Sequence, residues 1–142
     1  MRDDVELLKE CGAGVKMGIQ SIVDVRDKAY GEDFKNTLDK YQGEHERILR
    51  DIYTKLEARG MAPEEPNPMA TMGSKFSTSM KLMMDGTDEK IADIMIDGCG
   101  MGIKSVSKYM NEYAGASKEV MDVANNVVVL EQNFMNDLRQ YL

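Results

Sequence analysis

Apolar side chains recur at steps of three and four residues along most of this 142-residue chain, which is the spacing of one face of an α-helix. Four long stretches show this pattern, and none is dominated by the strict alternation of a half-buried strand. The pattern therefore predicts an all-α fold with four long helices. The predicted inward positions are, in chain order, Leu8, Cys11, Val15, Gly18, Ile22, Val25 and Ala29; Phe34, Leu38, Tyr41, His45, Ile48, Ile52 and Leu56; Ile91, Met95, Cys99, Ile103, Val106, Met110 and Tyr113; and Val120, Val123, Val127, Glu131, Phe134, Leu138 and Tyr141.

The ends of the helices are marked by short polar breaks. The first helix is predicted from Asp3 to Tyr30 and is followed by the break GED at 31–33. The second is predicted to end at the sequence ARG, where Gly60 suits the position just past a helix end because glycine adopts positive φ. Thr87 and Ser117 suit the starts of the third and fourth helices, since their hydroxyl oxygens can accept a hydrogen bond from the first turn.

A long connection separates the second and third long helices. All three prolines fall in MAPEEPNP at 61–68, which predicts a loop there. The following stretch, 69–84, carries apolar residues at helical spacing and five of the thirteen methionines, so we predict a short helix. Methionine is favoured at adaptable binding surfaces, which makes this segment the candidate contact with a protein partner or with a second copy in a homodimer. The alternative is that it packs on the bundle.

The chain contains an internal repeat. CGAGVK at 11–16 is nearly repeated as CGMGIK at 99–104, 88 residues later, and the second helix aligns with the fourth at a shift of 86 residues. The repeat predicts one domain over residues 1–142. It is built from hairpin 1 (about 3–59), a crossover (about 60–86) and hairpin 2 (about 87–141). Short turns within each hairpin predict antiparallel neighbours.

Glycines cluster inside the first and third helices, at Gly12, Gly14, Gly18, Gly98, Gly100 and Gly102. Each costs about 1 kcal/mol relative to alanine in a helix interior, so a compensating reason is expected. Close contact between helix backbones is the explanation that we favour, and room for a ligand or a large side chain is the other. No strand precedes either cluster, which argues against a nucleotide-binding loop.

Composition excludes several classes of function. A net charge of −7 argues against general affinity for nucleic acid or for an anionic membrane surface. No stretch approaches the roughly 20 apolar residues that cross a bilayer. Two cysteines are too few for a disulfide framework, and the charged start MRDDVELLKE does not resemble a signal peptide, so we expect a cytoplasmic protein.

Two repeated helical hairpins joined by a long crossover resemble the ferritin-like and rubrerythrin-related four-helix proteins of bacteria. The stretch MKLMMDGTDEKIADIMIDGCGMGIKSVSKYMNEY (80–113) carries this resemblance best. The resemblance implies a ferritin-like bundle with a crossover helix. It also implies a di-iron site built from one Glu on each of the first and third helices and a Glu-x-x-His pair on each of the second and fourth.

This chain departs from that ligand set. His45 and Glu131 occupy equivalent inward positions of the second and fourth helices, but neither belongs to a Glu-x-x-His pair. Counting from the turns places His45 opposite Met17 and Gly18, and Glu131 opposite Cys99. We expect a buried hydrogen bond between His45 and Glu131 and expect the di-iron site to be lost, because such a site needs about four carboxylates.

The leading hypothesis is therefore a non-enzymatic structural or interaction module without a cofactor. The alternative is a metal-binding or redox protein that holds iron, manganese or zinc at His45 and Glu131, with help from Glu10, Asp97 or a cysteine. For Cys11 and Cys99, small buried core residues are expected ahead of soft metal ligands or a redox pair.

Overall fold

The computed structural model describes residues 2–62 and 86–142, and this part of the chain is helical, with no strand. The helices are α1 (Arg2–Arg26), α2 (Glu32–Ala58), α4 (Asp88–Glu112) and α5 (Lys118–Leu138), followed by a 3₁₀ turn, η2 (Arg139–Tyr141). The predicted all-α class with four long helices is confirmed. The predicted Met-rich helix at 69–84, with its role in partner binding, lies outside the described residues.

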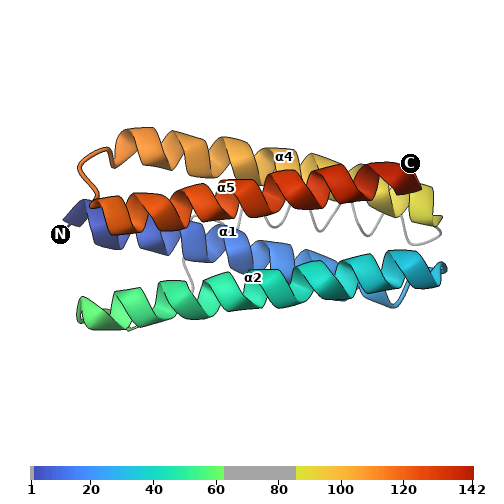
Figure 1. The fold of residues 1–142 in the computed structure, drawn as a ribbon, viewed down its shortest axis with the longest axis horizontal. Coiled ribbons are helices and arrows are strands. Elements are labelled where there is room, and N and C mark those ends of the chain that lie inside the picture. The colour runs from blue at the N-terminus through green and yellow to red at the C-terminus, as the bar shows by residue number, and fades with distance from the viewer. Residues whose placement is uncertain (1, 63–85) are drawn as a thin grey trace.

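The four helices pack side by side along their length. In Figure 1 the chain runs along α1 and returns along α2, and it does the same along α4 and α5. Within this arrangement α1 and α5 each pack against all three other helices. The stripes predicted from the sequence form the interior: most of the predicted inward residues are buried, while Gly18, Ile48, Ile103, Met110, Tyr113 and Tyr141 are half-buried.

The buried side chains form two apolar clusters, one toward each end of the bundle. The first includes Phe34, Tyr41 and Phe134, and the second includes Leu8, Ile52 and Val120. Burial of such side chains contributes about 1.5–3 kcal/mol each and stabilises the amphipathic helices. His45 follows Tyr41 by one helical turn on α2 and lies in the stretch of the bundle where the two clusters meet.

The helix ends agree with the sequence at three of the predicted signals. Gly60 adopts a φ of 76° just past the end of α2. The side chain of Thr87 accepts a hydrogen bond from the N–H of Lys90 at 3.3 Å, and that of Ser117 accepts one from the N–H of Val120 at 3.4 Å. The predicted C-terminal glycine and both N-terminal caps are therefore confirmed.

The end of α1 was predicted wrongly, because the helix stops at Arg26 and not at Tyr30. The chain leaves the helix through a turn in which the N–H of Lys28 donates to the carbonyl of Val25 at 2.9 Å. The N–H groups of Tyr30 and Gly31 then donate to the two carboxylate oxygens of Asp88, each at 2.8 Å. A side chain from the other hairpin thus fixes this turn.

The turn of the second hairpin is held in a matching way by the start of α1. The carboxylate of Asp4 accepts a hydrogen bond from the N–H of Ser117 at 2.6 Å, and that of Asp3 accepts one from the N–H of Gly115 at 3.0 Å. Asp4 also pairs with Arg59 at 3.1 Å. Each hairpin therefore supplies the acceptors that close the other hairpin's turn.

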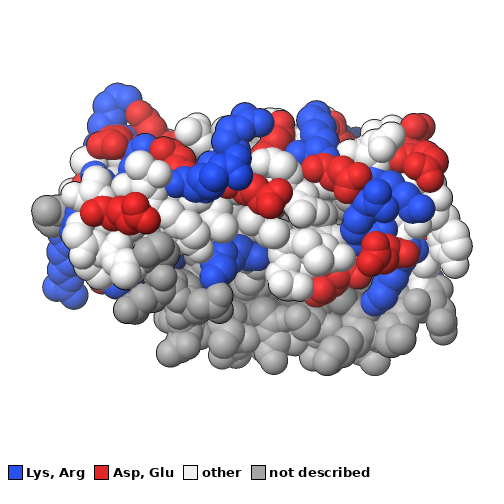
Figure 2. Space-filling view, turned by 90° about the horizontal axis from the view of Figure 1, so that it is seen from below, with Lys and Arg blue, Asp and Glu red and all other residues white. Residues whose placement is uncertain are grey.

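Charged side chains of both signs are mixed on the surface. Figure 2, which views the molecule from the side of α2, shows Lys and Arg interspersed with Asp and Glu. The pairs include Arg26 with Asp39 at 2.8 Å and Lys55 with Asp51 at 2.7 Å. Exposed pairs of this kind contribute little to stability, about 0–1 kcal/mol each. None of the described helices is long and apolar enough to span a bilayer.

Candidate functional site

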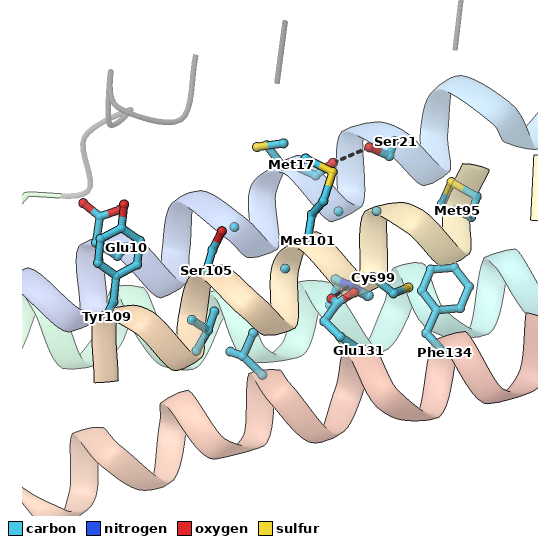
Figure 3. Close-up of a pocket in the computed structure, with 17 residues that line it drawn as sticks. Glu10, Met17, Ser21, Met95, Cys99, Met101, Ser105, Tyr109, Glu131 and Phe134 are labelled. Atoms are coloured by element: carbon cyan, nitrogen blue, oxygen red, sulfur yellow. Dashed lines mark hydrogen bonds and ion pairs between the residues drawn. The ribbon is translucent and has the colours of Figure 1, made fainter. Parts of the chain in front are cut away.

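A cavity of about 60 Å³ lies between α1 and α4, with residues of α2 and α5 at its base. Four of the clustered glycines line it together with methionine side chains: Gly14, Gly18, Gly98 and Gly102. Figure 3 shows Met17 and Met101 in its middle, Glu10 with Tyr109 at one end, and Glu131 with Cys99 toward the other. The cavity thus joins two groups of polar side chains through an apolar middle.

His45 and Glu131 form the polar group at the base. Nε2 of His45 lies 2.6 Å from Oε1 of Glu131, and Nδ1 lies 2.6 Å from the backbone carbonyl oxygen of Tyr41. The histidine side chain is fully buried and Glu131 is 8% exposed. The expected hydrogen bond between the two residues is present.

The two contacts of His45 determine its protons. A carbonyl oxygen only accepts, so Nδ1 carries a hydrogen and donates to Tyr41. Burial alone lowers the pKa of His45, but the hydrogen bond and the negative charge of Glu131 raise it above its ordinary value. Since Nδ1 already donates to Tyr41, the short contact between Nε2 and Oε1 of Glu131 needs one proton between them, and the net charge of the pair is then zero.

Gly18 on α1 makes room for this pair. A Cβ atom at residue 18 would lie 2.8 Å from Cδ2 and 2.9 Å from Nε2 of His45. A Cβ at residue 102 would lie 3.7 Å from Cγ of Glu131, which is an ordinary contact. The absence of a side chain at Gly18 thus leaves room for the large side chain of His45 on α2. Room for a large side chain was the alternative to close contact between helix backbones in the sequence analysis.

The other glycines have different surroundings. A Cβ at Gly12 would lie 3.4 Å from Cγ2 of Ile52, and one at Gly100 would lie 3.7 Å from Cε of Met135. A Cβ at Gly14 would meet no atom within 4 Å among the described residues, and Gly14 lines the cavity. An added Cβ atom at Gly12 or Gly100 would thus meet a side chain, and one at Gly14 would enter open space. Gly98 lines the cavity.

The two cysteines are separate and buried. Cys99 lies in the first apolar cluster and Cys11 in the second, and both are free thiols. Burial raises the pKa of Cys11 to about 12, and burial together with the charge and hydrogen bonding of Glu131 raises the pKa of Cys99. Thiols that stay protonated are poor nucleophiles, so neither is suited to covalent catalysis.

The polar group at the other end contains Glu10 and Tyr109. Burial raises the pKa of Glu10, and the charges of Glu6 and Glu112 act in the same direction, while hydrogen bonding from the Tyr109 hydroxyl opposes them. Oε2 of Glu10 is buried and accepts no hydrogen bond from the described part of the chain. Glu10 therefore lines the cavity at a distance from His45, and Asp97, the other carboxylate considered as a helper, is exposed.

The donor set does not fit a dinuclear iron site. Within residues 2–62 and 86–142, no three His, Cys, Asp or Glu side chains converge in a way that could hold a metal ion. Both ring nitrogens of His45 are hydrogen-bonded to protein atoms, and the residue of α1 that lies opposite the ring is Gly18. Such a site needs several oxygen ligands with histidine support, and this layer presents one carboxylate.

Sequence reasoning found His45 and Glu131 but missed the cavity and the partnering of Glu10 with Tyr109. The glycine clusters were the available signal, since Gly14, Gly98 and Gly102 all line the cavity. Comparison of the chain with protein-family models, with curated proteins and with solved structures finds no match.

Proposed function

We propose that this chain is a ferritin-like, antiparallel four-helix bundle that acts as a structural or interaction module by binding and not by di-iron chemistry. The observation that carries the proposal is the pairing of His45 with Glu131. The residues equivalent to metal ligands bond to each other at 2.6 Å and form a net neutral pair. A group satisfied in this way stabilises the core and has no free coordination position to offer.

The residues opposite this pair support the same conclusion. A ferritin-like site takes a carboxylate from each of the first and third helices. Here Gly18 of α1 faces His45 of α2. Gly102 and Cys99 of α4 lie beside Glu131 of α5. The internal repeat supports the ferritin-like arrangement, because His45 and Glu131 are separated by 86 residues, the shift that aligns the second helix with the fourth.

The competing function is a metal-binding or redox protein that uses His45 and Glu131 for iron, manganese or zinc. One observation favours it: Glu131 contributes to the raised pKa of Cys99, which indicates that the thiol lies close to this carboxyl group. A metal there would have to displace the proton shared by His45 and Glu131 and deprotonate a buried thiol whose pKa is raised.

Metal analysis separates the two functions. The purified protein is incubated anaerobically with Fe²⁺, Mn²⁺ or Zn²⁺, desalted and analysed by elemental mass spectrometry, beside the double variant His45→Gln, Glu131→Gln. The proposed function predicts no stoichiometric metal in either protein. Stoichiometric metal in the wild type that disappears in the double variant overturns it, provided that circular dichroism shows both proteins to be helical.

A further inference from the structure

The cavity end at Glu10 presents a carboxyl group that is hydrogen-bonded by the Tyr109 hydroxyl and keeps one oxygen without a donor among the described residues. Oε2 of Glu10 is shielded from solvent and accepts no hydrogen bond from the described residues. The neighbouring charges that act on this carboxyl group are those of Glu6 and Glu112, both negative. A buried acceptor without a donor costs about 1–3 kcal/mol, and more when it is charged. The position is therefore suited to a positively charged hydrogen-bond donor.

The aromatic side chains beside Glu10 suit the same kind of group. The Tyr109 ring stacks on that of Tyr113 with centroids 6.2 Å apart and an interplanar angle of 12°. Figure 3 shows Tyr109 directly beside Glu10 at this end of the cavity, which it also lines. Aromatic faces attract organic cations through their quadrupole. A carboxylate beside the Tyr109 ring is thus a setting that favours an ammonium group over an anion.

Apart from Ser105, the wall that follows Glu10 is apolar. Beyond Glu10 the cavity continues along Gly14 and Met17 on α1 and along Met101 and Val106 on α4. Its volume of about 60 Å³ exceeds the roughly 10–15 Å³ that one water molecule needs, so it admits a group of several heavy atoms. Thioether and methyl groups give few hydrogen bonds to water and adapt to an alkyl chain.

We propose that this cavity binds a short primary alkylamine, with the ammonium group at Glu10 beside Tyr109 and the alkyl chain along Gly14 toward Met17 and Met101. The ammonium group donates to the Glu10 carboxylate at the cavity wall and neutralises the local negative charge. The alkyl chain fills the space that the glycines leave between α1 and α4. This inference deepens the proposed binding role and rests on it, because it names the ligand class that the bundle would bind.

The test uses n-butylamine as the probe near neutral pH, where it is protonated, with n-butanol and butyrate as comparison ligands. Isothermal titration calorimetry is carried out on the full chain and on the variants Glu10→Gln and Gly14→Leu. Two matched controls are Glu46→Gln, an exposed carboxylate on α2, and Gly43→Leu, an exposed helical glycine with open space around it. Circular dichroism checks that each variant is helical.

Saturable binding of butylamine is expected, with butanol and butyrate weaker by about tenfold or more. Glu10→Gln is expected to weaken the amine by a similar factor, because the variant keeps the size of the side chain and loses its charge. Gly14→Leu is expected to abolish binding by filling the cavity, and the two controls are expected to bind as the wild type does.

The proposal is overturned if a folded wild-type protein does not bind butylamine, if butanol binds equally well, or if Glu10→Gln binds the amine unchanged. Since Glu10→Gln preserves the core, a folding failure of Gly14→Leu does not remove the test. The metal analysis judges the proposed function separately: metal at His45 and Glu131 overturns that function, and failed amine binding without metal overturns this inference alone.

Discussion

A Cβ atom on Gly18 of α1 would lie 2.8 Å from the ring of His45 on α2, closer than side chains in proteins normally approach. The ring has no freedom to retreat, because hydrogen bonds of 2.6 Å hold both of its nitrogens. The position of the histidine and the absence of a side chain at residue 18 therefore depend on each other.

Gly18→Ala is expected to destabilise the protein by about 1–3 kcal/mol, the usual cost of overpacking a core. The matched control is Gly43→Ala, where an added Cβ meets no described atom within 4 Å and the residue is exposed. That control is expected to stabilise the protein by about 1 kcal/mol through helix propensity. Denaturant unfolding of both variants measures the difference, and equal effects at the two positions would contradict this account of Gly18.

Protonation of His45 is expected to link stability to pH. The folded-state pKa is raised above the ordinary value of 6.5, so the folded protein holds this proton more tightly than the unfolded chain does. The stabilisation is complete below about pH 6.5 and is lost as the pH rises through the folded pKa. The chain has one histidine, so a proton NMR titration reports this group without ambiguity.

A midpoint above 6.5 in the NMR titration is the expected result. The double variant His45→Gln, Glu131→Gln is expected to lose this part of the pH dependence of unfolding. A titration midpoint below the ordinary value would show that burial dominates over Glu131 and would contradict this account of the pair.

Asp88→Asn tests the contact between the two hairpins. The carboxylate accepts two backbone hydrogen bonds, from Tyr30 and Gly31, and an amide side chain offers only one acceptor atom for them. The expected loss is about 1–3 kcal/mol, with faster hydrogen exchange at the Tyr30 and Gly31 amides. Glu89→Gln removes a charge from the same helical turn at an exposed position and is expected to leave both amides protected.

The cysteines are expected to resist modification in the folded protein. Both thiols are buried, and burial raises the pKa of each. A colorimetric thiol reagent at mildly alkaline pH should react slowly with the native protein and rapidly with two thiols per chain after denaturation. Fast reaction of one thiol in the native state would contradict the placement of Cys11 or Cys99 in the core.

The sequence predicted the interior of the bundle well because each helix carries a regular apolar stripe. The facing of His45 and Glu131 was also predictable, since both lie on these stripes at positions related by the internal repeat. These features follow from the three- and four-residue spacing of apolar side chains, which can be read directly from the sequence.

Features that depend on the spacing between helices were not predictable in the same way. The end of α1 was placed four residues too late because Asp88, 57 residues beyond Gly31, fixes the turn. The cavity beside Gly14 depends on how far α1 and α4 stand apart, which periodicity does not contain. Oε2 of Glu10, which has no hydrogen-bond partner within residues 2–62 and 86–142, is likewise a property of the packed structure.

The reciprocal contacts of Asp88 with the first turn, and of Asp3 and Asp4 with the second, mean that neither hairpin is a self-sufficient folding unit. A peptide holding one hairpin alone leaves its turn amides without acceptors and its apolar stripe without a partner surface. Two such peptides, covering residues 1–62 and 86–142, are therefore expected to be unstructured apart and to complement each other when mixed. Although the chain repeats one pattern twice, these contacts predict that it folds in a single cooperative step.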